Sequence, residues 1–192
     1  SSIEPHFEKG GKFQKYYPIF EMIETIFFTS NTVTKAAPHA RSFVDMKRIM
    51  TYVVISTIPC VLWALYNTGF QTNSALSSLD IKEISGWRIH LLQLTGLGID
   101  PTSLVSNVSH GLLYFLPIYI TTLVAGGLCE VIFATVRGHE VNEGFLVSSM
   151  LFALTLPAST PLWQVALGIA FGVVVAKEVF GGTGKNFLNP AL

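Results

Sequence analysis

The chain has 192 residues, of which 50% are hydrophobic and only 12% are charged, and its mean hydropathy is +0.51. Soluble domains contain about 25% charged residues, so this composition argues against an ordinary soluble domain. The formal net charge is zero and no basic patch is interleaved with aromatic residues, so we do not expect a nucleic-acid partner. The composition indicates an all-α integral membrane protein.

Residues 1–48 are predicted to form a cytoplasmic or interfacial segment ahead of a transmembrane domain over 49–192. Between residues 13 and 27, apolar side chains recur at spacings of three and four, which predicts an amphipathic helix too polar to span a membrane. Its aromatic content suits the membrane interface, and packing on a soluble partner protein is the alternative. A charged, aromatic stretch comes first rather than an apolar core, so no signal peptide is expected.

Three apolar segments are long enough to be predicted as spanning helices, at about 49–70, 111–136 and 162–180. About 20 residues cross a hydrocarbon core of about 30 Å. Pro117 is expected to kink the second segment, and a short surface helix is compatible with residues 89–97. The sequence ends soon after the third segment, in a manner that suggests a cut rather than a natural terminus.

A fourth apolar segment, at about 144–157, is too short to span and is interrupted between Pro157 and Pro161. Broken helices place helix ends and free backbone groups next to ligands in membrane proteins. A tilted or re-entrant packing helix without a ligand explains the same pattern, and both interpretations stay open.

The distribution of basic residues predicts the orientation of the chain. Seven of the 12 Lys and Arg residues lie at or before Arg48, whereas the connection 71–110 carries only Lys82 and Arg88. Because basic residues accumulate in cytoplasmic segments, the N-terminus, the 137–143 loop and the C-terminal glycine-rich turn are predicted to face the cytoplasm.

Glu130 lies in the second long apolar segment, where a carboxylate is costly and is usually functional or paired. Gly126 and Gly127 precede it by four and three residues, so the three share one helical face. Such a face admits a flat ligand ring beside a carboxylate that holds a cation or accepts a proton. Close packing of another helix on small residues is the equally weighted alternative.

Lys177 and Glu178 near the end of the last apolar segment are interpreted as residues that extend to the membrane interface. Being neighbours, they fall on different helix faces and need not pair. Beyond them, the glycine-rich turn lacks the G-x-x-x-x-G-K-[ST] spacing of a nucleotide-binding loop. Asn186 and Asn189, three residues apart, offer amide donors and acceptors to a heteroaromatic ring, or else serve turn and capping roles.

The cysteines and histidines predict neither a disulfide nor a metal site. Cys60 and Cys129 lie in separate apolar runs, where packing is the ordinary role of a cysteine. The histidines show no metal-ligand spacing and fall in loops or at segment ends: His6, His39, His90, His110 and His139.

Several runs together resemble one family, the B-type subunits of the sodium-translocating NADH:quinone reductase, over nearly the whole chain. The most specific run extends from Phe171 to the end of the sequence. The others are Lys47–Met50, Tyr114–Tyr119, the Gly126-Gly127 pair with Glu130, and His139–Phe145. The D-type subunits of the ferredoxin-linked Rnf complex are similar but are expected to match less closely.

The resemblance implies a fold of two five-helix repeats similar to urea channels, of which this chain supplies most of the first. It implies noncovalent riboflavin near Asn186 and Asn189, and quinone binding near Gly126, Gly127 and Glu130, with the N-terminal segment and Phe20 helping to cover that site. Glu130 and Glu21 match acidic positions implicated in sodium handling. The family attaches FMN covalently within a Ser-Gly-Ala-Thr motif, which is absent here and is expected downstream of this sequence.

The resemblance therefore implies a multi-pass subunit of the bacterial inner membrane that couples electron transfer, from NADH through flavins to ubiquinone, to sodium export. Flavins carry the redox chemistry, so no catalytic side chain is assigned, and the isolated chain is not expected to be active. Other subunits, ubiquinone, sodium and lipid are the implied partners. An Rnf subunit, or a passive channel or transporter of the same fold, is the alternative.

Overall fold

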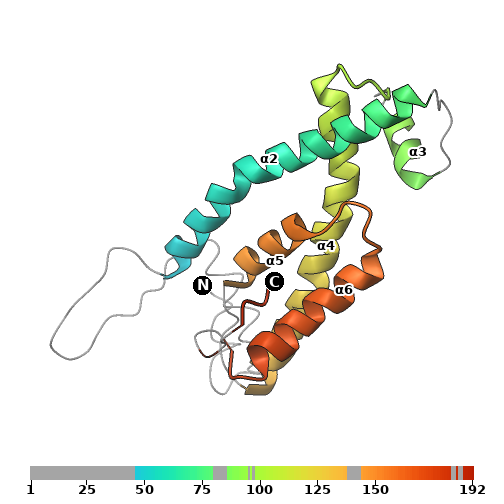
Figure 1. Ribbon diagram of the computed structural model, residues 1–192. Coiled ribbons are helices and arrows are strands. Elements are labelled where there is room, and N and C mark those ends of the chain that lie inside the picture. Colours follow the sequence, from blue (N-terminus) through green and yellow to red (C-terminus); the bar gives the residue numbers. More distant parts are fainter. Residues whose placement is uncertain are drawn as a thin grey trace, which may run out of the picture.

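The structure is a computed structural model that describes residues 46–79, 86–94, 96, 98–137, 144–182, 185 and 188–192. Within these residues the regular elements are helices, and no strand occurs (Figure 1). They are α2 (Met46–Ser78), α3 (Trp87–Leu94), α4 (Leu104–Arg137), α5 (Gly144–Thr155), α6 (Leu162–Phe171) and the π-helix η3 (Gly172–Glu178). Among the described helices, α2 from Ile49 onward and α4 are long and apolar enough to cross a membrane.

The helices α2 and α4 cross, and each has a glycine at the point of contact (Figure 1). A Cβ atom on Gly69 would lie 1.7 Å from the carbonyl oxygen of Asn107, and one on Gly111 would lie 1.8 Å from the carbonyl oxygen of Leu65. Each glycine therefore lies directly against the backbone of the other helix. Small residues allow this approach, and in lipid close packing takes over the role that the hydrophobic effect plays in water.

Buried polar side chains flank this crossing and form a connected hydrogen-bond chain. Asn107 Nδ2 donates to the carbonyl oxygen of Pro101 (2.9 Å), and Asn73 Nδ2 donates to Asn107 Oδ1 (2.8 Å). Asn73 Oδ1 lies 2.7 Å from His110 Nδ1. Because a carbonyl oxygen only accepts, the order of donors is fixed, and His110 Nδ1 carries the proton. His110 Nε2, the last atom of the chain, is buried and has no hydrogen-bond partner among the described residues.

Replacement of Asn73 by leucine is expected to destabilise the α2–α4 crossing by about 1–3 kcal/mol, because it strands the buried Asn107 Oδ1 and His110 Nδ1 without a partner. Asn67→Leu is the matched control, since Asn67 is an exposed residue of the same helix. Thermal unfolding of the full-length protein in detergent measures the difference. Equal melting temperatures for the two variants would contradict a stabilising role for the chain.

The short helix α3 contacts α4 where Pro117 removes a backbone hydrogen bond from that helix. Proline has no N–H, so the carbonyl oxygen of Leu113, four residues earlier, loses its helical donor. Arg88 Nε donates to that oxygen instead, at 3.1 Å. The guanidinium group also lies 4.7 Å from the ring centre of Trp87 and 4.6 Å from that of Tyr114. Arg88 thus satisfies an acceptor in the middle of α4.

The helices α5 and α6 pack along the other part of α4 in two clusters (Figure 1). One cluster centres on Ile118, Ala153 and Val165. The other centres on Phe145, Ile169 and Val173. Val165 and Ile169 have no exposed surface. By contrast, large apolar side chains on the outer faces of α2 and α4 stay exposed, as expected of helices that meet lipid or other protein.

Helices α2 and α4 extend beyond the apolar runs that predicted them, whereas α5 ends at Thr155 and η3 at Glu178, within the predicted ranges. Helix α2 continues past residue 70 to Ser78, and α4 begins at Leu104 rather than near residue 111. His110, expected at a segment end, lies inside α4. The added turns contain the polar residues of the crossing, and Asn73 joins the two helices by hydrogen bonds with Asn107 and His110. The predicted amphipathic helix at residues 13–27 lies outside the described residues.

Candidate functional site

The glycine face of α4 is occupied by side chains from α5 and α6. A Cβ atom on Gly126 would lie 2.6 Å from Phe145 Cε2 and 2.8 Å from Ile169 Cγ1. A Cβ atom on Gly127 would lie 3.6 Å from Phe145 Cε1, an ordinary contact. The flat ring beside these glycines is therefore that of Phe145. Of the two interpretations drawn from the sequence, this packing fits the small-residue contact between helices.

The two adjacent glycines are expected to respond differently to an added methyl group. Gly126→Ala forces Phe145 and Ile169 to move and should cost about 1–3 kcal/mol, the usual range for overpacking. Gly127→Ala meets only an ordinary contact and should leave stability unchanged or slightly raised. Thermal unfolding of the two variants side by side gives the comparison. A Gly127→Ala variant as unstable as Gly126→Ala would show that the glycines share another constraint.

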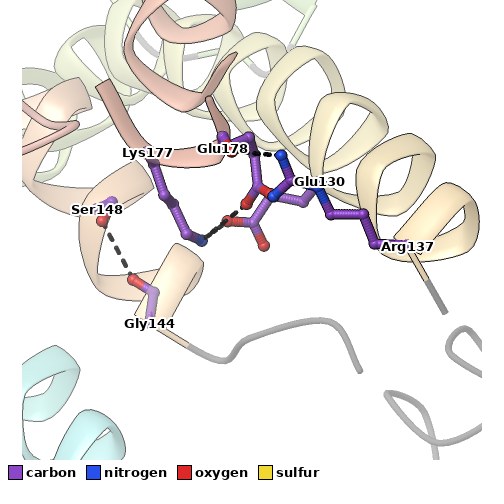
Figure 2. Close-up of polar contacts among 6 residues, drawn as sticks. All are labelled: Glu130, Arg137, Gly144, Ser148, Lys177 and Glu178. Atoms are coloured by element: carbon purple, nitrogen blue, oxygen red, sulfur yellow. Dashed lines mark hydrogen bonds and ion pairs between the residues drawn. The ribbon is translucent and has the colours of Figure 1, made fainter. Parts of the chain in front are cut away.

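One turn beyond the glycines, Glu130 belongs to a buried network of four charged side chains (Figure 2). Lys177 Nζ donates to Glu130 Oε1, and the same ammonium lies 4.0 Å from Glu178 Oε1. Arg137 Nη1 lies 3.2 Å from Glu178 Oε2, and Arg137 Nη2 donates to the backbone oxygen of Glu178 at 2.6 Å. Its described members are two carboxylates and two cations, whose formal charges sum to zero.

Burial differs across the network. The side chains of Glu130, Lys177 and Glu178 are 3%, 7% and 4% exposed, whereas that of Arg137 is 33% exposed. The pair between Glu130 and Lys177 is thus enclosed by protein, and Arg137 is the member with access to the surroundings. Removal of one partner of a buried pair costs about 3–5 kcal/mol, because the other charge remains buried without compensation.

The π-helix η3 brings both charged residues of the last segment inward. Its wider hydrogen-bonding pattern includes a bond of 2.9 Å from Val179 N to the oxygen of Val174, five residues earlier. Ala176, Lys177 and Glu178 are all buried. The interpretation of Lys177 and Glu178 as interfacial residues was therefore wrong: α4 supplies a counter-ion for each. The sequence does contain a suitable partner for each on α4, Glu130 for Lys177 and Arg137 for Glu178. Their pairing, however, depends on the π-helical geometry of η3 and could not be read from the sequence.

The C-terminal segment packs on the start of η3. A Cβ atom on Gly172 would lie 2.4 Å from the carbonyl oxygen of Pro190. Asn189 is exposed, and its Oδ1 accepts a hydrogen bond of 3.0 Å from Ala191 N. This is local turn chemistry, one of the two roles weighed for that amide, and it is no evidence for a flavin contact. Asn186, Phe20 and Glu21 lie outside the described residues.

The apolar helices with enclosed ion pairs define a helical protein of the membrane class, in which charged groups are neutralised internally. The chain belongs to the NQR2, RnfD, RnfE family, whose model matches residues 33–192.

Relatives at about half identity share one name, which describes them as the B-type subunit of a Na(+)-translocating NADH-quinone reductase. The protein from Chromohalobacter salexigens is 52% identical over 190 residues, which is 99% of this chain and 46% of the relative. Those from Pseudomonas paraeruginosa and Pseudoalteromonas atlantica are 53% and 51% identical, again over 99% of this chain and over 47% and 48% of the relatives. The chain thus spans about half the length of the curated relatives it matches.

Proposed function

We propose that this chain is the first half of a membrane subunit that couples electron transfer from NADH, through flavins, to ubiquinone with the export of sodium. The names of the relatives support the reaction. The observation that carries the proposal is Glu130: a carboxylate buried in a helix able to cross a membrane and held by an ammonium group from another helical segment. Ionisable groups in such positions typically line ion pathways.

Within this proposal, Glu130 and Glu21 take part in sodium handling. Gly126, Gly127, Glu130 and Phe20 lie near the quinone, and a quinone ring on the glycine face would require the Phe145 ring to move. Asn186 and Asn189 contribute to a riboflavin site, while covalent FMN belongs to the other half of the protein. A bound flavin supplies electron transfer, and this chain's residues position it and balance charge.

The proposed setting is the bacterial inner membrane, with the N-terminus in the cytoplasm, the chain crossing several times, and the other subunits of the complex around it. The wider division into a 1–48 segment and a 49–192 transmembrane domain, the latter supplying part of a five-helix repeat, belongs to the same proposal. Helices α2 and α4 and their exposed apolar faces support a membrane location.

The proposal is tested in inverted membrane vesicles that contain the complete complex. NADH-driven quinone reduction that rises with sodium, and is accompanied by sodium uptake, is the expected result. Activity that needs reduced ferredoxin and NAD instead would assign the chain to the Rnf branch that the family description also includes. Sodium flux in an intact complex without any NADH-driven reduction would favour a passive channel or transporter.

A further inference from the structure

We propose that Lys177 is an internal counter-ion that competes with the transported cation for Glu130, so that sodium binds by displacing its ammonium group. This inference rests on the proposed function and assigns to the last described helical segment a role in setting cation affinity. Lys177 is a positioning residue in this scheme, since it acts through the Glu130 carboxylate.

The position of the ammonium group is the first support. Lys177 Nζ contacts Glu130 Oε1, where an incoming cation would take its carboxylate oxygen, and both side chains are almost fully buried. Hard cations such as sodium bind oxygen ligands, and helix ends with free carbonyl groups contribute to sodium sites in membrane proteins. The ammonium and a sodium ion therefore require the same atom.

The charge balance is the second support. Among the described residues the four charges sum to zero, so a sodium ion added to them would leave one positive charge without a described counter-charge, which is costly in a medium of low polarity. Sodium binding becomes favourable when one of the resident cations gives up its place. If the Lys177 ammonium group never left the Glu130 carboxylate, sodium could not bind there. If the ammonium group can be displaced, sodium binds by exchanging with it.

The third support is that a second carboxylate, that of Glu178, lies near the ammonium group that sodium would displace. Glu178 Oε1 lies 4.0 Å from Lys177 Nζ, so a small movement transfers the ammonium from one carboxylate to the other. Glu178 is at present shared with Arg137, whose side chain is 33% exposed. As Lys177 takes Glu178, the guanidinium of Arg137 can turn outward and carry the surplus charge away from the enclosed pair. No covalent bond changes in this exchange.

A purely structural role for Lys177 predicts a different change in sodium affinity from the one that competition predicts. If Lys177 only holds η3 against α4, its removal lowers stability and does not help a cation to bind. If Lys177 competes with sodium, its removal strengthens sodium binding. The sign of the change in affinity therefore separates the two roles, independently of any change in stability.

The experiment uses the full-length protein in its purified complex, with all variants compared at the same pH. Equilibrium binding of ²²Na⁺ and the sodium concentration for half-maximal NADH-driven turnover are measured for Lys177→Met and Lys177→Arg. We expect Lys177→Met to lower the dissociation constant for ²²Na⁺ and the sodium concentration for half-maximal turnover roughly tenfold or more. The effect is large because the competing charge that is removed is buried and therefore little screened. Lys177→Arg keeps a competing cation and should stay within about threefold of the parent protein.

Two further variants keep the result interpretable. Lys177→Gln retains a donor for Glu130 Oε1 without the charge, and it replaces Lys177→Met if that variant does not assemble. Lys185→Met removes an exposed lysine from the same end of the chain and should leave sodium affinity unchanged. An assembled Lys177→Met or Lys177→Gln complex with equal or weaker ²²Na⁺ binding overturns the inference. A parent complex that binds ²²Na⁺ but never reduces quinone with NADH overturns the proposed function instead.

Discussion

Gly111→Ala is expected to prevent α2 and α4 from closing on each other. The new Cβ atom would lie 1.8 Å from the carbonyl oxygen of Leu65, which is inside any allowed contact distance. That oxygen belongs to the backbone of a helix and cannot rotate away as a side chain can. The expected loss is therefore at or above the upper end of overpacking costs, about 3 kcal/mol.

The fraction of monodisperse full-length protein that survives heating in detergent measures this effect. Gly127→Ala adds the same methyl group to the same helix, with its nearest contact at 3.6 Å, and serves as the control. Alanine also favours a helix over glycine by about 1 kcal/mol, so both variants gain equally in propensity. A Gly111→Ala protein as stable as the control would mean that the helices do not cross at this point.

Glu130→Gln is expected to raise the sodium concentration for half-maximal turnover roughly tenfold or more. The substitution keeps the shape of the side chain but removes the negative charge, which at an effective dielectric constant of about 20 is worth up to about 4 kcal/mol to a cation at about 4 Å. The maximal rate should fall less than the affinity, because Glu130 is assigned no contact with a flavin. Sodium titrations of NADH-driven quinone reduction separate the two effects.

Asp100→Asn is the control for loss of a carboxylate, because Asp100 is exposed and precedes α4. Along α4, the helical rise from its first residue, Leu104, to Glu130 is about 40 Å, so Asp100 is far from the candidate site. Thermal unfolding is measured in parallel, because Lys177 loses its partner in Glu130→Gln. Unchanged sodium dependence in a folded Glu130→Gln complex would exclude this carboxylate from sodium handling.

Hydropathy predicted the helical class and the approximate position of each long helix but not where the helices end. Residues 71–78 and 104–110 are polar or contain small residues, so they were interpreted as connections. They are helical because their polar groups bond across the crossing, as Asn73 does with Asn107. A partner this distant in the sequence leaves no periodic signal, and hydropathy alone cannot supply it.

Only part of the candidate site was predictable, because some of its contacts also come from residues distant in the sequence. The spacing of Gly126, Gly127 and Glu130 placed them on one helical face, and Gly126 and Glu130 are buried together. Neither the Phe145 ring over the glycines nor the Lys177 counter-ion was foreseen. Both come from other helices, and an α-helical pattern for the last segment does not indicate that two adjacent charged residues are enclosed together.

The π-helical turns of η3 make the network depend on chain register as well as on residue identity. The bond from Val179 N to Val174 O spans five residues, which is the spacing of a π-helix. Deletion of a single residue between Gly172 and Glu178 would let the segment close as an ordinary helix, in which each position turns by about 100°. The two ion pairs would then lose their alignment with α4 even if all four charged residues were kept. Homologues that preserve these charges should therefore also preserve the number of residues in this stretch.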